Sequence, residues 1–254
     1  SACKNFSIDI IFICFPKKLI EHLEKLFHKH QILIDQFICS SYAKSFNYKK
    51  HFDEFNNLVF LDIGYEKTSV ICYKKDQLKS FGVLSVGGHH ITRDIANVLK
   101  LEINISEKIK SNLNKNIIFS DTAESKELLE KDFLNKISNK ELSLGLIKKI
   151  IFARIDETLN LSFNLMQGST TDNNTDQLKV VLIGQGAKIL DNRYIDIEET
   201  KPLVEEFDFF EESTINICQS GLRLSQGINK QEVLIIPKKL EKKGLFERLF
   251  YLFK

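Results

Sequence analysis

The sequence has few cysteines, and their placement argues against the two usual structural roles of that residue. The 254-residue chain holds five cysteines, an odd number, and no two of them form a Cys-x-x-Cys pair. This spacing indicates neither a disulfide framework nor a zinc site. We therefore expect the cysteines to be reduced residues of the protein interior.

A large excess of one charge and long apolar runs are also missing. The 36 Lys and Arg residues nearly balance the 34 Asp and Glu residues, which leaves a net charge of +2. Such a balance gives no electrostatic reason to expect a nucleic-acid partner. No apolar run approaches the ~18 residues of a membrane-spanning helix, so we expect any membrane contact to come from the surface.

The most informative feature that is present is a glycine pair between a strand and a helix. In residues 85–96 an alternating strand runs into Gly87 and Gly88, and a helical pattern follows. Glycines let backbone N–H groups approach a phosphate or a ribose, and the helix N-terminus adds positive potential. A tight turn without any ligand is the alternative. No nucleophile or orienting carboxylate motif accompanies His89 and His90, so we interpret them as residues at the start of the helix.

Two more glycine turns follow predicted strands. Residues 58–64 indicate a buried strand that ends in Asp-x-Gly, and residues 68–85 continue as a meander. Residues 179–187 form another apolar strand, which is broken by a Gly-x-Gly turn. We expect the three glycine turns to converge on one nucleotide.

These motifs resemble those of the actin, Hsp70 and sugar-kinase superfamily. Residues 61–64 with Thr68 look like its second phosphate loop, and residues 181–187 look like its adenosine loop. Residues 86–96, followed by a Glu-x-x-Lys motif in residues 106–110, are more particular and resemble the bacterial cell-division family FtsA. The resemblance implies an α/β fold: an actin-like (ribonuclease H-like) ATPase lobe with an inserted subdomain and a C-terminal amphipathic helix.

The resemblance also implies a nucleotide site with ATP and Mg²⁺ as cofactors. Glu107 and Lys110 would hold the ribose or base, and Asp62 would position a magnesium-bound water without any side chain binding the metal directly. The residues implied for the site are Asp62, Gly64, Thr68, Gly87, Gly88, Glu107, Lys110, Gly184, Gly186 and Ala187.

The second phosphate loop departs from the family pattern. Tyr65, Glu66 and Lys67 replace Gly, Gly and Thr, and Ser69 replaces Asp. A tyrosine and a glutamate crowd a phosphate cradle, and the Glu66 carboxylate repels phosphate, although Lys67 nearby offsets that charge. We therefore expect nucleotide binding but at most weak ATP hydrolysis, and we assign no catalytic residue.

The resemblance implies that the chain covers the later part of the family's fold, with the first phosphate loop lying before residue 1. Residues 1–56 would be a remnant of lobe 1, namely the end of subdomain 1C and the last helix of 1A. Residues 57–100 and 177–236 would form subdomain 2A, and residues 101–176 the inserted subdomain 2B.

Two segments outside these motifs also carry predictions. Residues 7–15 indicate a buried strand, and Pro16 then opens a helix. The apolar residues of that helix are expected to face the core: Leu19, Ile20, Leu23, Leu26 and Phe27. The acidic stretch at residues 205–212 is interpreted as a solvated loop.

Residues 142–166 predict a long helix in the inserted subdomain, with Leu146 among its apolar-face residues. Arg154 and Glu157, at i and i+3, project together from the opposite side. By spacing alone the pair is a surface salt bridge worth less than about 1 kcal/mol. The resemblance implies instead that it receives the C-terminal peptide of the tubulin-like FtsZ.

The chain ends in an amphipathic segment, residues 244–254, after a charged linker at residues 237–243. A short helix with phenylalanine and leucine on one face and lysines at its start suits a membrane interface with anionic lipid. Packing on the protein's own core is the alternative. The resemblance implies a membrane tether, with these residues at the lipid: Lys242, Lys243, Leu245, Phe246, Arg248, Leu249, Phe250, Leu252 and Phe253.

The function implied by the resemblance is an actin-like scaffold that anchors FtsZ filaments to the cytoplasmic face of the bacterial inner membrane at the division septum, with ATP binding as a switch. The implied partners are the FtsZ C-terminal peptide, an anionic membrane surface, further copies in actin-like filaments, and later divisome proteins. Nucleic acid is not expected. The alternatives are a PilM-like pilus-platform protein, which lacks the detachable C-terminal helix, and a sugar- or acetate-kinase-type enzyme, which needs a catalytic carboxylate.

Overall fold

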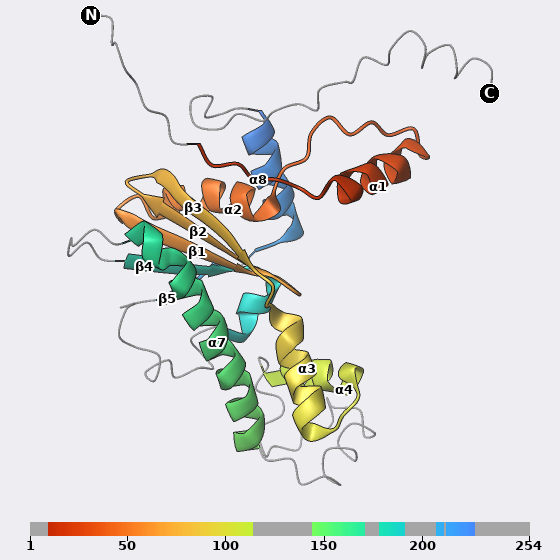
Figure 1. The fold of residues 1–254 in the computed structure, drawn as a ribbon, viewed down its shortest axis with the longest axis vertical. Coiled ribbons are helices and arrows are strands. Elements are labelled where there is room, and N and C mark those ends of the chain that lie inside the picture. The colour runs from red at the N-terminus through yellow and green to blue at the C-terminus, as the bar shows by residue number, and fades with distance from the viewer. Residues whose placement is uncertain (1–9, 114–143, 171–177, 191–206, 211, 227–254) are drawn as a thin grey trace, which may run out of the picture.

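A mixed sheet of five strands forms the centre of the described fold (Figure 1). The computed structural model describes the chain except for residues 1–9, 114–143, 171–177, 191–206, 211 and 227–254. The strand order is β3-β2-β1-β4-β5; β1 to β3 are antiparallel neighbours, whereas β1, β4 and β5 are parallel. The strands are β1 (Asn57–Ile63), β2 (Thr68–Lys74), β3 (Gln77–Leu84), β4 (Leu178–Ile183) and β5 (Phe207–Phe209).

The predicted meander is confirmed by β1, β2 and β3. Their β-branched and aromatic residues favour extended backbone. β2 returns into β3 through Lys75 and Asp76, whose φ angles are 46° and 67°. Positive φ at both residues of a two-residue turn matches the right-handed twist of the flanking strands.

Helices lie on both sides of the sheet (Figure 1). α2 (Ser40–Tyr48) and α8 (Thr214–Ser225) pack against each other on one face. On the other side α7 (Leu144–Thr170) contacts β2 and β3, and α3 (Gly88–Leu99) packs between α7 and α4 (Ile103–Leu113). Two short 3-10 helices, η1 (Lys49–His51) and η2 (Gln185–Leu190), follow α2 and β4.

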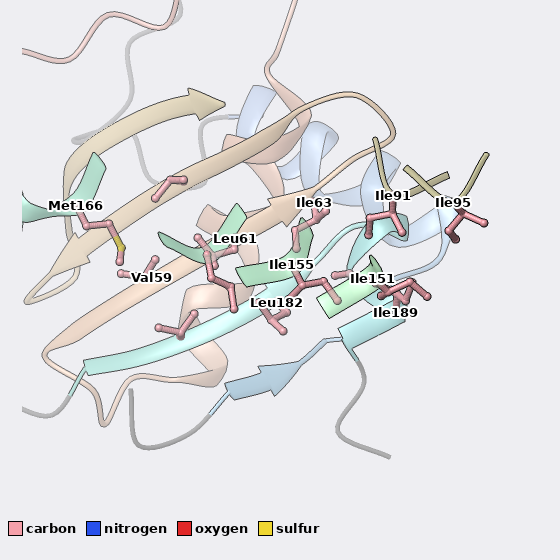
Figure 2. Packing of buried hydrophobic residues seen from close by; sticks show 14 of the residues in the cluster. Val59, Leu61, Ile63, Ile91, Ile95, Ile151, Ile155, Met166, Leu182 and Ile189 are labelled. Atoms are coloured by element: carbon pink, nitrogen blue, oxygen red, sulfur yellow. The ribbon is translucent and has the colours of Figure 1, made fainter. Parts of the chain in front are cut away.

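Successive residues of each central strand enter two different hydrophobic cores. Val59 and Leu61 of β1 join Ile155 of α7 in one core, part of which is drawn in Figure 2. Phe60, between them, packs with Tyr48 of α2 in the other. Because both faces of the sheet are covered, each central strand is a nearly continuous apolar run. The charged Asp62 in β1 is an exception, and its buried carboxylate needs a positively charged partner.

Three expectations that concern the first part of the chain are wrong. The cysteines were expected in the interior, but Cys14 is exposed, as is Cys218 near the other end. The described residues 10–16 form no strand, and Ile10 and Phe12 are 64% and 68% exposed. The segment pairs with none of the five strands, so its backbone lacks the ladder bonds that hold a buried strand. α1 (Lys17–His28) forms as predicted, but none of its residues is buried, so the apolar stripe does not face the core.

The acidic stretch at residues 205–212 is also not a solvated loop in its described part. Phe207–Phe209 form β5, which pairs with β4 in parallel. The Phe210 ring stacks on Tyr48 with 4.3 Å between centroids, and the Glu212 side chain is only 2% exposed. Phenylalanines between the acidic residues therefore draw the segment into the fold, because burying an aromatic ring outweighs the solvation of its neighbours.

The predicted long helix is confirmed by α7, in which Ile151, Ile155 and Leu159 are buried. Leu146 was expected on the same face but is 43% exposed. No helix among the described residues is long and apolar enough to cross a membrane. The linker and the amphipathic segment at residues 237–254 lie outside the described residues.

Candidate functional site

The three glycine turns meet around the carbonyl oxygen of Gly64. The Gly88 N–H donates to this oxygen at 2.9 Å. A Cβ atom built on Gly87 would lie 2.7 Å from the same oxygen, and one built on Gly186 would lie 2.8 Å from it. Such distances are closer than real Cβ contacts, so the turns after β1, β3 and β4 approach each other only because side chains are absent.

Gly184 needs glycine for a second reason. Its φ of 90° lies where side-chain-bearing residues are strained. A Cβ atom there would also lie 2.5 Å from the Asp62 Oδ1 atom and from the Ile63 carbonyl oxygen. The turn after β4 is thus fitted tightly against the end of β1.

Several hydrogen-bond donors of these turns are bonded within the chain. The Gly64 N–H donates to the Lys67 carbonyl at 2.8 Å, and the Gly87 N–H donates to His90 Nδ1 at 3.2 Å. The hydroxyl of the buried Thr68 donates to the Val86 carbonyl at 2.7 Å. A phosphate can use these particular donors only by displacing their internal acceptors.

The loop after β1 packs against the start of α3. The Tyr65 ring stacks on the His89 ring with 4.5 Å between centroids, and the Tyr65 carbonyl accepts from the His89 N–H at 2.7 Å. His89 and His90 both lie in the first turn of α3, which confirms their interpretation as residues at the start of the helix. Tyr65 itself is 62% exposed, so its ring lies at the protein surface against His89.

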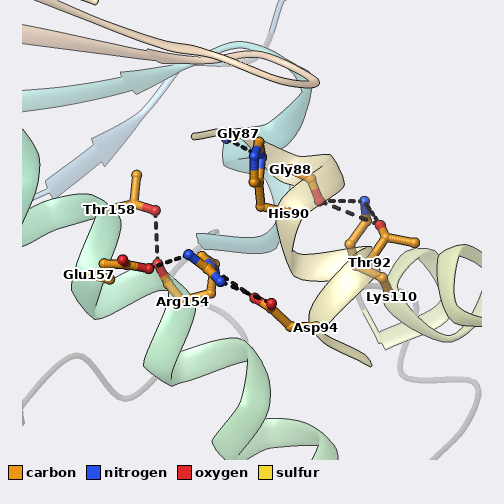
Figure 3. Close-up of polar contacts among 9 residues, drawn as sticks. All are labelled: Gly87, Gly88, His90, Thr92, Asp94, Lys110, Arg154, Glu157 and Thr158. Carbon is orange, nitrogen blue, oxygen red and sulfur yellow. Dashed lines mark hydrogen bonds and ion pairs between the residues drawn. The ribbon is translucent and has the colours of Figure 1, made fainter. Parts of the chain in front are cut away.

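Glu107 and Lys110 of α4 lie beside the glycine pair (Figure 3 draws Lys110 next to Gly88). Lys110 Nζ donates to the Gly88 carbonyl at 3.0 Å, to the Thr92 hydroxyl at 2.8 Å and to Glu107 Oε2 at 2.8 Å. The Thr92 hydroxyl also donates to Glu107. Partial burial raises the pKa of the Glu107 carboxyl, but bonds from Lys110 and Thr92 and the nearby positive charge lower it overall.

The donor set around α4 fits the sugar end of a nucleotide. The Glu107 carboxylate is 43% exposed and ionised, so it can accept hydrogen bonds from ribose hydroxyls, and Lys110 can donate to them. Ala187 is fully buried at the start of η2, where its N–H donates to the Gly184 carbonyl at 3.2 Å. The predicted residues are therefore gathered in one place around the three glycine turns.

A buried ion cluster that sequence reasoning missed holds the end of β1. Lys44 Nζ of α2 lies 2.7 Å from Asp62 Oδ1 and 3.1 Å from Glu212 Oε2. Glu212 Oε2 also accepts from the Gly184 N–H at 2.8 Å. No local signal in the sequence indicated the cluster, because Lys44 is separated from Asp62 by 18 positions and from Glu212 by 168.

This cluster does not fit the implied magnesium ion. The Asp62 carboxylate that would position a metal-bound water is 8% exposed and already paired with an ammonium group. No group of three or more His, Cys, Asp or Glu side chains among the described residues can hold a metal ion. The residues present thus fit a ribose and not a magnesium ion held next to Asp62.

Arg154 and Glu157 project together as predicted, and Arg154 has a second partner. Its Nε and Nη2 atoms donate to Asp94 Oδ2 and Oδ1 of α3 at 2.6 and 2.9 Å, while Nη1 pairs with Glu157 (Figure 3). The bond to Asp94 raises the pKa of the guanidinium further above its usual value. Arg154 therefore joins α7 to α3, the helix that starts at the glycine pair.

Two curated relatives are similar to part of the chain. The cell division protein FtsA of Streptococcus pneumoniae serotype 2 is 24% identical over 144 residues, which is 57% of this chain and 31% of the relative. The cell division protein FtsA of Helicobacter pylori is 27% identical over 106 residues, which is 42% of this chain and 22% of the relative. The alignments thus span less than a third of either relative.

A solved structure and a family model agree with these relatives. The structure of MreB 5 of Spiroplasma citri bound to AMPPNP superposes with a TM-score of 0.56 at 14% identity and covers 85% of this chain and 66% of that chain. The α/β fold is accordingly actin-like, as predicted. The family model of the cell division protein FtsA matches residues 59–229, more than half of the chain, and the chain therefore belongs to the FtsA family.

Proposed function

We propose that this chain is an actin-like division scaffold, which anchors FtsZ filaments to the cytoplasmic face of the bacterial inner membrane at the septum and helps assemble the divisome. The match of the FtsA family model to residues 59–229 carries the proposal, because that stretch holds all three glycine turns and α7. Family membership favours this function over a pilus-platform protein or a sugar- or acetate-kinase-type enzyme.

Within this proposal a nucleotide acts as a conformational or polymerisation switch, with ATP the nucleotide that the family implies. The ribose is held by Glu107 and Lys110, and the purine lies along the turn from Gly184 to Ala187. Phosphates reach the Gly87 N–H only after His90 releases it. Binding therefore rearranges the start of α3, which is the property that a switch needs, while rapid hydrolysis is not expected.

The FtsZ C-terminal peptide is proposed to bind α7 at Arg154 and Glu157. Support comes from their exposure, because the two side chains remain 24% and 50% accessible despite their ion pairs. A carboxylate of the peptide would share the guanidinium with Asp94, and Arg is suited to such two-pronged contacts. Since Asp94 lies on α3, which begins at the glycine pair, peptide and nucleotide would act on one pair of helices.

Membrane attachment is assigned to the amphipathic segment at residues 244–254, released by the linker at 237–243. The lysines at the end of the linker and the apolar face of the segment match the requirements of an interfacial helix on anionic lipid.

Residues 57–100 and 177–236 are proposed as subdomain 2A, residues 101–176 as 2B, and residues 1–56 as the remnant of lobe 1. Further copies of the chain are proposed to assemble through these lobes into actin-like filaments.

The peptide assignment can be tested by fluorescence anisotropy with a labelled FtsZ C-terminal peptide. We expect Arg154→Ala to weaken binding about tenfold, which corresponds to ~1.4 kcal/mol, and to leave binding to anionic liposomes unchanged. Asp156→Ala is the matched control, because Asp156 is exposed on the same helix and bonds only to Asn160 in its own turn. Equal peptide affinities for all three proteins would refute the assignment.

A further inference from the structure

Lys44, Asp62 and Glu212, here called the Lys44 cluster, bring three buried charges together from distant parts of the chain. Their side chains are 6%, 8% and 2% exposed. Lys44 comes from α2, Asp62 from β1, and Glu212 from the segment after β5. Buried charges persist only when they are paired, so each carboxylate depends on the single ammonium group between them.

The Lys44 cluster lies directly against the glycine turns. Asp62 Oδ1 would be 2.5 Å from a Cβ atom on Gly184, and Glu212 Oε2 accepts the Gly184 N–H. Asp62 is separated from Gly64, where the three turns meet, by one residue. The charge balance of the cluster is therefore part of the electrostatics of the candidate nucleotide site.

The ammonium of Lys44 occupies the point that a divalent cation would need. Carboxylate oxygens are the ligands that Mg²⁺ and Mn²⁺ prefer, and two of them face this point from 2.7 and 3.1 Å. A lysine ammonium is a compact charge with three donors, so it can satisfy both oxygens at once. A divalent ion placed beside it would meet like-charge repulsion in a poorly solvated position.

We propose that Lys44 is a built-in counter-cation, which takes the place of the metal at Asp62 and makes nucleotide binding independent of Mg²⁺. The 2.7 Å contact between Lys44 Nζ and Asp62 Oδ1 supports this reading, because it leaves no room for a metal ion between the two groups. Removal of the ammonium turns the cluster into a pair of facing carboxylates, which is a divalent-cation site. The nucleotide part of the inference rests on the proposed function, whereas the exclusion of metal by Lys44 does not.

The first test uses the nucleotide-free 254-residue chain and Mn²⁺, with the free ion followed by electron paramagnetic resonance. The wild type and Lys44→Arg are expected to bind no Mn²⁺ at the cluster, since both keep the positive charge. Lys44→Met is expected to gain one Mn²⁺ site and to recover in thermal stability when Mn²⁺ is added. Adding Asp62→Asn and Glu212→Gln to Lys44→Met should abolish the gained site and remove the need for Mn²⁺ in folding.

The second test measures ADP binding by titration calorimetry with Mg²⁺ and with EDTA. The proposal predicts that the wild type binds ADP equally well, to within about twofold, in Mg²⁺ and in EDTA. It also predicts that the ADP affinity of Lys44→Met is about tenfold or more lower in EDTA than in Mg²⁺. A wild-type affinity that falls by that factor in EDTA, or a Lys44→Met chain that gains no Mn²⁺ site, overturns it. If the wild type binds no ADP under either condition, the proposed nucleotide switch fails, and the Mn²⁺ measurement still decides the role of Lys44.

Discussion

Two nitrogen atoms of the Arg154 guanidinium on α7 donate to the two carboxylate oxygens of Asp94 on α3, at 2.6 and 2.9 Å. Both side chains are 24% exposed, so the pair is only partly screened by water. The contact spans 60 residues of sequence and joins the helix that begins at the glycine pair to the helix proposed to bind FtsZ. The pair therefore connects the proposed nucleotide site at the start of α3 to the proposed FtsZ site on α7.

The strength of this pair can be measured with a double-mutant cycle. We expect Arg154→Ala and Asp94→Ala each to lower the free energy of unfolding by roughly 1–2 kcal/mol, because the first removes both nitrogen donors of Asp94 and the second leaves Arg154 with Glu157 alone. The double variant should lose less than the sum of the two single losses. Urea denaturation of the four proteins gives the coupling energy, and additive losses would show that the pair contributes nothing.

Two glycine-to-alanine substitutions, one in a glycine turn and one inside a helix, should change stability in opposite directions. Gly87→Ala should destabilise the chain by several kcal/mol, since its Cβ would lie 2.7 Å from backbone atoms of the loop after β1. Gly221→Ala should raise stability by up to ~1 kcal/mol, because Gly221 is inside α8 and a Cβ there meets no atom within 4 Å. Thermal unfolding of both variants checks the signs, and a harmless Gly87→Ala would contradict the tight convergence.

Acid should weaken the fold through Glu107. Its pKa is lowered in the folded chain, so its ionised form stabilises the fold above the unfolded value of about 4.3. That stability is lost as the pH falls through the lower folded pKa. The difference in unfolding free energy between wild type and Glu107→Gln should thus be full near pH 6 and shrink toward pH 3. A difference that stays the same from pH 6 to pH 3 would contradict this prediction.

Alkali should weaken the fold through Tyr48. Burial, with the negative charges of Glu212 and Asp62, raises the pKa of its hydroxyl to about 12. The neutral form is therefore favoured on folding, and the associated stability is complete below the unfolded pKa of about 10 and declines as the pH rises toward 12. Wild type should lose stability relative to Tyr48→Phe over that interval. Parallel curves for the two proteins would mean that the hydroxyl ionises as freely in the folded chain as in the unfolded one.

The parts of the fold that depend on local sequence were predictable. The meander, its polar turn at Lys75 and Asp76, and the glycine turns after β1, β3 and β4 all follow from residue types a few positions apart. Helix α7 follows from apolar spacing in the same way, and α3 from the helical pattern that begins at the glycine pair. The convergence of the three turns was expected because each is a glycine turn at the end of a strand, whereas Gly64 as their meeting point was not predicted.

The errors concern partners that are distant in sequence. An amphipathic pattern shows that α1 has an apolar face but cannot show what covers it, and residues 10–15 resemble a strand without a neighbour to pair with. The bond from Lys44 to Glu212 spans 168 residues, so neither side chain could be assigned to the interior from its local context. Glu212 also follows a run of acidic residues, which is a pattern typical of solvated loops.

Recruitment of FtsZ to lipid by this chain is the most direct test of the proposed scaffold. FtsZ filaments would be mixed with anionic liposomes and floated through a density gradient, because filaments sediment by themselves whereas liposomes rise. The account predicts that FtsZ floats with the liposomes only when the chain is present. Arg154→Ala should reduce the floated FtsZ while the chain itself still floats, and a Phe246→Glu, Phe250→Glu variant should abolish flotation of both. FtsZ that stays at the bottom with the intact chain, although the chain reaches the liposomes, would contradict the account.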